Sequence, residues 1–169
     1  MNLNTFFIAQ LEREIASTRN VVERVPDGND DWKPHPKSMP LGYLSSLVAG
    51  MFAWIALMID NDHLDLAGAG SGGPKAGTRD ERVALFDKSV ADARRALENT
   101  NDDHLMQRWQ LRLGDKVVDE KQRYAMIADT FSHLAHHRGQ LTVYLRLNDQ
   151  PVPSIYGPTA DESWQQGEN

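Results

Sequence analysis

The sequence contains no cysteine. This absence excludes disulfide bonds, a thiolate nucleophile and metal sites built on thiolate ligands, so any bound metal ion must be held by nitrogen and oxygen atoms. Basic residues are also few, with 18 lysines and arginines against 24 aspartates and glutamates, and the net charge is -6. Because phosphate backbones are bound by basic surfaces, we expect no nucleic acid partner.

A long uninterrupted hydrophobic run is missing as well. The most apolar stretch, residues 41–58, contains two glycines and two serines and ends at a polar string that starts with Asp60. It has no basic flank, so it predicts a buried helix rather than a membrane span. The first residues lack the charged and apolar regions of a signal peptide, and we therefore expect a cytoplasmic protein with no membrane partner.

Hydrophobic residues recur with helical spacing at about residues 3–25, 38–60, 78–98 and 121–148. Thr78 with Glu81 three residues later forms a capping box that starts the third helix. Between the third and fourth helices, alternation around a Gly-Asp turn indicates a short irregular hairpin within residues 105–118. The pattern predicts an all-α fold: a four-helix bundle over residues 1–158, with a loop-rich insertion between the third and fourth helices, and a frayed polar C-terminal tail over residues 159–169.

Two long connections separate the predicted helices. The first, residues 26–40, is rich in proline and predicts an extended loop that Trp32 anchors to the bundle. His35 in this loop is expected to be exposed, and a place at the mouth of a site is the alternative. The second, residues 67–77, is rich in glycine but lacks the Gly-Lys-Ser/Thr string and the preceding strand of a phosphate-binding loop, which excludes that interpretation.

Three of the six histidines lie within residues 131–141. On a helix, His133 and His137 fall one turn apart on one flank of the apolar stripe, whereas His136 points almost directly away. Two imidazoles spaced in this way can offer two nitrogen ligands to one divalent metal ion, although a catalytic metal normally takes three protein ligands. The alternative is that both are polar residues at the edge of a packing face, hydrogen-bonded to neighbours or to water.

Arg138 lies near the middle of the same apolar stripe, where a charge is costly unless it is paired. We expect it to pair with a carboxylate or with backbone carbonyls, with anion binding as the alternative.

The acidic pair Asp60 and Asp62 lies at a helix end, where it indicates helix termination rather than acid–base catalysis.

The segments at residues 32–39 (WKPHPKSM), 41–44 (LGYL) and 133–141 (HLAHHRGQL) together resemble the DinB superfamily, or DinB/YfiT-like metalloenzymes, and residues 147–158 resemble the ending of its members. The resemblance implies a four-helix bundle that is often dimeric and that binds a divalent ion such as Zn or Ni through three histidines. Its characterised members include thiol-dependent S-transferases and isomerases. A homodimer and a small-molecule or low-molecular-weight thiol substrate are therefore the expected partners.

By this resemblance His133 and His137 correspond to two of the metal ligands, and the third belongs at the position of Leu47. Leucine offers no lone pair, so the predicted site is incomplete, with a weak or absent metal unless water, His35, His63 or a neighbouring subunit completes it. Two functions stay open. One is a metal-dependent enzyme of the thiol S-transferase or hydrolase type with an impaired site, in which the metal activates a thiol or water. The other is a non-catalytic module that binds a small ligand or dimerises.

Overall fold

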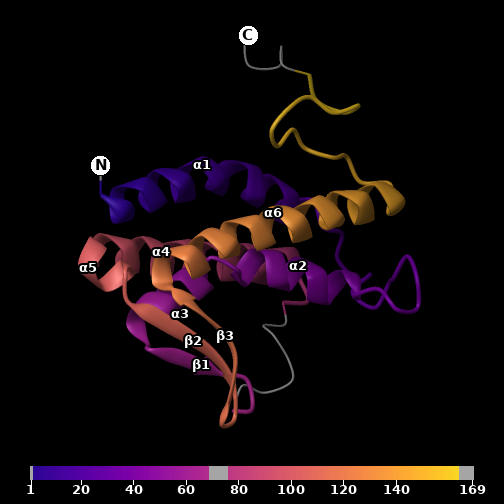
Figure 1. Cartoon of the computed structure of the whole chain (residues 1–169). Coiled ribbons are helices and arrows are strands. Elements are labelled where there is room, and N and C mark those ends of the chain that lie inside the picture. Colours follow the sequence, from indigo (N-terminus) through magenta and orange to yellow (C-terminus); the bar gives the residue numbers. More distant parts are fainter. Residues whose placement is uncertain (1, 69–75, 164–169) are drawn as a thin grey trace.

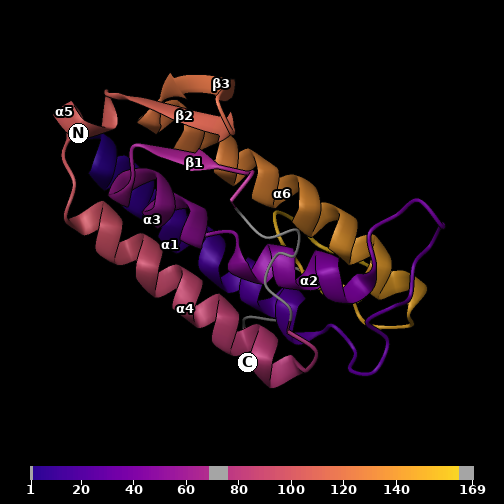
Figure 2. The same ribbon diagram turned by 90° about the horizontal axis from the view of Figure 1, so that it is seen from below.

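The computed structural model describes residues 2–68 and 76–163 of the chain. The elements in chain order are α1 (Leu3–Glu23), α2 (Leu41–Gly50), α3 (Ala53–Asp60), β1 (His63–Asp65), α4 (Arg79–Glu98), α5 (Asp102–Leu105), β2 (Arg108–Leu113), β3 (Lys116–Gln122) and α6 (Arg123–Leu147). The long helices α1, α4 and α6 pack with the α2–α3 pair, and the three strands lie beside α3 and the start of α6 (Figure 1 and Figure 2). The fold is therefore mostly helical, with six helices and a small sheet in the described residues.

Three predicted helices are confirmed as α1, α4 and α6, each within two residues of its expected bounds. The predicted start of α4 is confirmed in detail. The Thr78 hydroxyl accepts the Glu81 backbone N–H at 3.3 Å, and the Glu81 carboxylate accepts the Thr78 backbone N–H at 3.1 Å. The capping box satisfies two amide groups that a helix start otherwise leaves without partners.

The expectation of one continuous second helix was wrong, because the chain breaks into α2 and α3 with an angle of 52° between them. In a continuous helix the carbonyl of Ala49 would accept the backbone N–H of Ala53. Here the Ser89 hydroxyl of α4 donates to the Ala49 carbonyl at 2.7 Å, and a side chain inserted into the helical ladder is a known cause of a kink. Among the described residues no single helix is long and apolar enough to cross a membrane, and α2 and α3 meet that test only as a bent pair.

The all-α prediction needs a second correction, since the chain forms a three-stranded sheet in the order β1-β2-β3. The predicted hairpin is confirmed as the antiparallel β2–β3 pair, which turns at Gly114 with φ of +59°. β1 adds a parallel strand along β2, with His63 opposite Gln110. The part of the chain between α4 and α6 is thus a helical turn and a hairpin rather than a loop-rich insertion.

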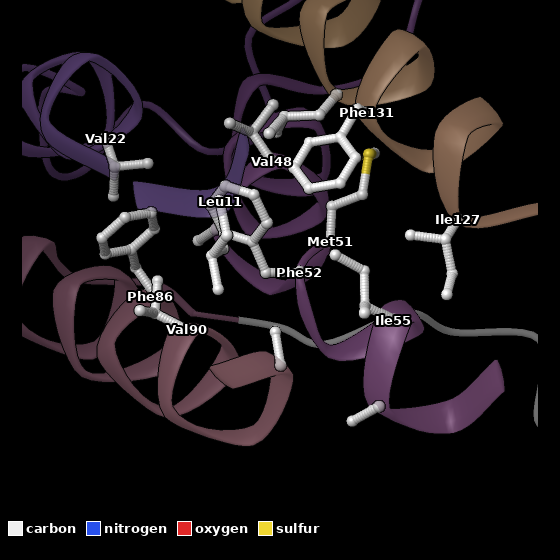
Figure 3. Close-up of a cluster of buried hydrophobic side chains, with 14 of the residues drawn as sticks. Leu11, Val22, Val48, Met51, Phe52, Ile55, Phe86, Val90, Ile127 and Phe131 are labelled. Atoms are coloured by element: carbon white, nitrogen blue, oxygen red, sulfur yellow. The ribbon is translucent and has the colours of Figure 1, made fainter. Parts of the chain in front are cut away.

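The hydrophobic core lies where α1, α2, α3, α4 and α6 meet (Figure 3). Phe52, at the break between α2 and α3, lies at its centre. Its ring packs edge-on against Phe86 of α4 at 6.0 Å between centroids, and against Phe131 of α6 at 6.2 Å. Aromatic pairs in this geometry add to the stabilisation from burial. The packing of Phe52 on Phe131 therefore connects the break between α2 and α3 to α6, the helix that carries His133 and His137.

The connection between α1 and α2 contains turns, one of them closed by the bond from the Ser38 N–H to the His35 carbonyl, so it is less extended than predicted. The Trp32 ring packs edge-on against Tyr144 of α6 at 5.4 Å, which confirms its anchoring role, and His35 is exposed as expected. Residues 69–75, the centre of the glycine-rich connection, lie outside the described residues, so the exclusion of a phosphate-binding loop there stays a prediction.

Replacing Gly42 with alanine should destabilise the fold by about 1–3 kcal/mol, because an added Cβ would lie 2.7 Å from the Cβ of Asp30. The backbone N–H of Gly42 donates to the Asp30 carbonyl at 2.9 Å, so the loop and the helix are held in this close approach. Gly139→Ala on α6 is the matched control, since nothing lies within 4 Å of its added Cβ. It should stabilise the helix by about 0.5–1 kcal/mol. Denaturant unfolding measures both, and a Gly42→Ala variant as stable as the wild type contradicts the packing argument.

Candidate functional site

His133 and His137 lie side by side on α6, as their spacing predicted. Their Nε2 atoms are 2.8 Å apart, and their ring centroids are 4.6 Å apart. His137 is buried at 6% exposure, whereas His133 and His136 are exposed. The pair thus has an inner and an outer imidazole, and solvent reaches it through His133.

A glutamine fixes the proton arrangement of the pair. His137 Nδ1 lies 2.8 Å from the Gln140 side-chain oxygen, which can only accept, so Nδ1 carries the hydrogen. In the neutral ring the His137 Nε2 is then an acceptor, and the His133 Nε2–H donates to it. The geometry defines a chain of donors from His133 through His137 to Gln140. Both Nε2 atoms are satisfied by each other, and a metal ion bound to both would have to displace the hydrogen between them.

Trp54 of α3 forms the wall beside His133. Its ring packs edge-on against the imidazole at 5.3 Å between centroids. Burial against this wall, followed by the nearby positive charges that His137 and His136 can carry, lowers the pKa of His133 below the ordinary value of histidine. The neutral imidazole is therefore favoured, and this is the form that binds a metal ion or accepts a proton.

Acidification should weaken the folded state through His133. Its pKa is lower in the folded than in the unfolded chain, so the unfolded chain binds more protons as the pH falls. The stabilisation is present above about pH 6.5, the ordinary pKa of histidine, and is lost as the pH falls through the lowered folded-state pKa. Free energies of unfolding measured from about pH 8 to pH 5 should fall more steeply for the wild type than for His133→Gln. Parallel profiles for the two proteins contradict the prediction.

Two contacts fix how the α2–α3 pair lies along α6. At one end the Tyr144 hydroxyl of α6 donates to the Met39 carbonyl at 3.2 Å, and at the other end Trp54 packs against His133. The two segments therefore run in opposite directions, and α2 packs against α6. Leu47 belongs to α2. It is half-buried and packs against the core.

Within residues 2–68 and 76–163, no three side chains of histidine, aspartate or glutamate come close enough to hold one metal ion. His35 and His63, the two histidines considered as a third ligand, are both exposed and are not brought to the pair. One chain therefore supplies two imidazole nitrogens, whereas a catalytic zinc site normally uses three protein ligands. This donor set does not fit a three-histidine metal centre.

Arg138 points to the other side of α6 and is fully paired, as predicted. Its guanidinium lies 2.8 Å from the Glu14 carboxylate of α1 and donates to the Thr18 hydroxyl at 2.7 Å, with arginine and glutamate exposed by only 1% and 4%. Glu14 was not predicted as the partner, although Phe7, Leu11, Glu14 and Thr18 share the spacing of a buried helix face. Each of two buried helix faces thus carries one charged residue, Glu14 on α1 and Arg138 on α6, and this pattern could have predicted the ion pair.

The segment after α6 covers this ion pair. The Tyr156 hydroxyl lies 2.6 Å from Arg138 and 3.0 Å from Glu14, and its ring packs over the guanidinium at 5.1 Å. Burial raises the pKa of Tyr156, Arg138 opposes this change and Glu14 adds to it. Tyr156 was not expected to contact the helices, because nothing in its local sequence names a partner 142 residues away.

The beginning of the polar tail is ordered rather than frayed. Asp161 pairs with Arg146 of α6, and Glu162 pairs with Arg24 at the end of α1. The prediction of fraying was therefore wrong for residues 159–162, and residues 164–169 lie outside the described part of the chain. These contacts hold the tail along α1 and α6.

One surface hollow lies away from the histidines. It has a volume of about 420 Å³ at the start of α2, with Asp30, Asp31 and Tyr43 on its walls, and neither His133 nor His137 lines it. The size of a surface hollow therefore does not identify the histidine pair as a functional site. The pair is a candidate because of the chemistry of its two imidazoles.

Comparison with known proteins places these features in context. The sequence model of the DinB superfamily matches residues 10–141, a span that contains Leu47 and both histidines. A DinB-like protein from Bacillus subtilis has a similar structure, with a TM-score of 0.67 and 17% identity over 88% of this chain and 96% of that one. A DinB-like protein from Bacillus cereus gives a TM-score of 0.69 and 18% identity over 89% and 95%. Such low identities concern the fold alone, and a search of curated proteins finds no match.

Proposed function

Because the chain belongs to the DinB superfamily, we propose that its working site is the His133–His137 pair, acting as an incomplete form of that family's metal centre. The observation that carries the proposal is the 2.8 Å contact between two imidazoles within the part of the chain that matches the family. In this proposal α1, the α2–α3 pair, α4 and α6 correspond to the four helices of the family's bundle. The pair is the remainder of a site that needs a third ligand.

A divalent ion such as Zn or Ni would be held weakly by this pair. Structural zinc sites total about 10–16 kcal/mol of binding free energy, so the loss of one ligand costs several kcal/mol. When bound, such an ion would lower the pKa of a thiol or a water molecule in its open positions, which is the chemistry of a thiol transferase or a hydrolase. Because two nitrogens do not fit the three-histidine centre, no catalytic step through the ion follows from one chain. A second copy in a homodimer is the proposed source of a further ligand.

The second candidate is a non-catalytic module of the same fold, which binds a small ligand or dimerises. It is favoured by the chain from His133 through His137 to Gln140, in which both imidazoles already have hydrogen-bond partners. A pair satisfied in this way has a structural role without any metal ion. The two candidates differ in whether His137 is needed for metal binding.

The purified and dialysed protein should contain clearly less than one metal ion per chain by elemental analysis, because two ligands hold it weakly. Calorimetric titration with Zn²⁺ or Ni²⁺ should then give a weak signal that His137→Ala abolishes. His136→Ala, an exposed neighbour on the same helix, is the control and should keep the signal.

The outcomes separate the candidates. Full occupancy after dialysis overturns the incomplete site. An equal response of the wild type and His137→Ala removes the metal-dependent candidate and supports the non-catalytic module.

A further inference from the structure

The segment that follows α6 is attached to the helices through side chains. Residues 151–162, which we call the strap, contain no helix or strand (Figure 1). In the described part of the chain, the last backbone hydrogen bond to a helix runs from the Gln150 N–H to the Leu145 carbonyl at 3.0 Å. Within the strap the Thr159 N–H donates to the Glu162 carbonyl. A segment without backbone pairing to its surroundings can open while the helices stay folded.

Asp161 closes the strap on α6. Its carboxylate pairs with the guanidinium of Arg146 and accepts the backbone N–H of Val152 at 2.8 Å. Arg146, followed by the Val152 N–H, lowers the pKa of Asp161 below the ordinary value of aspartate, so the carboxylate stays charged. One charged group therefore joins the two ends of the strap to each other and to α6.

Glu162 closes the strap on α1. Its carboxylate pairs with the guanidinium of Arg24 at the end of α1 and accepts the backbone N–H of Ser154 at 2.7 Å. The Ser154 N–H, followed by Arg24, lowers the pKa of Glu162 below the ordinary value of glutamate. Two neighbouring carboxylates thus hold the strap to two different helices.

Apolar burial of the strap is limited. Pro153 is its one buried residue, and Val152 and Ile155 are half-buried against the core. The Tyr156 hydroxyl reaches the buried ion pair of α1 and α6, but the tyrosine residue as a whole is 66% exposed. Charged contacts at the end of the strap and polar contacts at its middle therefore supply a large part of its attachment.

We propose that the strap is a conformational device that opens locally under the control of ionic strength, with Asp161 and Glu162 as the groups that close it. The side chains of both carboxylates and of their arginine partners are 25–50% exposed, so salt ions screen the attraction between them. Opening withdraws the Tyr156 hydroxyl from the ion pair below it and admits water there. No residue of the strap belongs to the histidine pair, so this inference goes beyond the proposed function.

The absence of cysteine from the chain makes a direct test possible. Pro153→Cys places one thiol at the buried position of the strap, and an aromatic disulfide reagent reacts with it when the strap opens. Ser45→Cys places a thiol of nearly the native size on the buried face of α2, where global unfolding exposes it. The Pro153→Cys thiol should react at least about tenfold faster than the Ser45→Cys thiol. Its rate should rise at least about threefold from about 0.05 M to about 1 M NaCl.

Removing the two carboxylate charges tests what closes the strap. In the Pro153→Cys protein, Asp161→Asn combined with Glu162→Gln should give at low salt the labelling rate that the parent protein reaches at about 1 M NaCl, with little further rise. Glu12→Gln is the matched control, because Glu12 is an exposed carboxylate that pairs with Arg94. It should leave the labelling rate and its salt response unchanged.

Three results overturn the proposal. These are equal labelling rates of the two thiols, a Pro153→Cys rate that salt leaves unchanged, and equal effects of the double variant and Glu12→Gln. If Pro153→Cys prevents closure, hydrogen exchange of the backbone amides of residues 155–162 in the wild type gives the same comparison, with the amides of α4 as the reference. The metal titration uses other variants, so either proposal can fail alone.

Discussion

Replacing Leu47 with histidine should raise the affinity of the protein for Zn²⁺ or Ni²⁺ by at least about a hundredfold. The family resemblance puts the third ligand at Leu47, on a helix that packs against α6, so an imidazole there would supply the third nitrogen of a complete donor set. One ligand's share of about 10–16 kcal/mol is about 3 kcal/mol or more, and each 1.4 kcal/mol corresponds to a factor of ten. Calorimetric titration of the dialysed variant measures the gain.

Two further variants show whether the gain comes from coordination. Leu47→Val changes the packing without adding a ligand and should leave metal affinity at the wild-type level. Leu47→His combined with His137→Ala again has two imidazoles and should return to weak binding. If Leu47→His binds no better than the wild type, the assignment of this position as the third-ligand position is wrong.

Replacing Arg138 with methionine should lower the free energy of unfolding by about 3–5 kcal/mol. The change leaves the buried Glu14 carboxylate without its guanidinium partner, and breaking a buried ion pair on one side has a cost of this size. The loss is a large fraction of the stability of an ordinary domain, so denaturant unfolding should show it as a clear fall in the midpoint.

The same experiment separates burial from charge. Combining Arg138→Met with Glu14→Leu removes both charges and should restore most of the lost stability, because no unpaired charge remains. Arg94→Met removes an exposed arginine that also pairs with α1, and it should change the midpoint little. Equal losses from Arg138→Met and Arg94→Met contradict the assignment of a buried pair.

Local patterns explain most of the helical fold. The spacing of apolar residues locates α1, α4 and α6, and the capping residues Thr78 and Glu81 fix one start to the residue. At the break between α2 and α3, the Ala49 carbonyl accepts from Ser89, which is 40 residues away along the chain, and no local pattern contains that pairing. β1 is three residues long and exists only through its pairing with β2, so sequence periodicity cannot reveal it.

The candidate site likewise has features that local sequence predicts and features that it does not. The spacing of His133 and His137 predicts their contact because one helical turn brings them together, and the cost of a buried charge predicts that Arg138 is paired. The partners that complete each group come from distant parts of the chain. The spacing of α1 marks Glu14 as buried, but its pairing with Arg138 and the contact of Tyr156 arise only when α1, α6 and the tail are packed together.

Because Tyr156 contacts the Glu14–Arg138 pair from a distant part of the chain, this cluster can be completed only late in synthesis on the ribosome. Synthesis proceeds from the N-terminus, so Glu14 is made 142 residues before the tyrosine that contacts it. Until Arg138 emerges, the first helix presents an acidic group on a face that it later buries. A nascent chain halted before Tyr156 still lacks the hydroxyl group that contacts this ion pair.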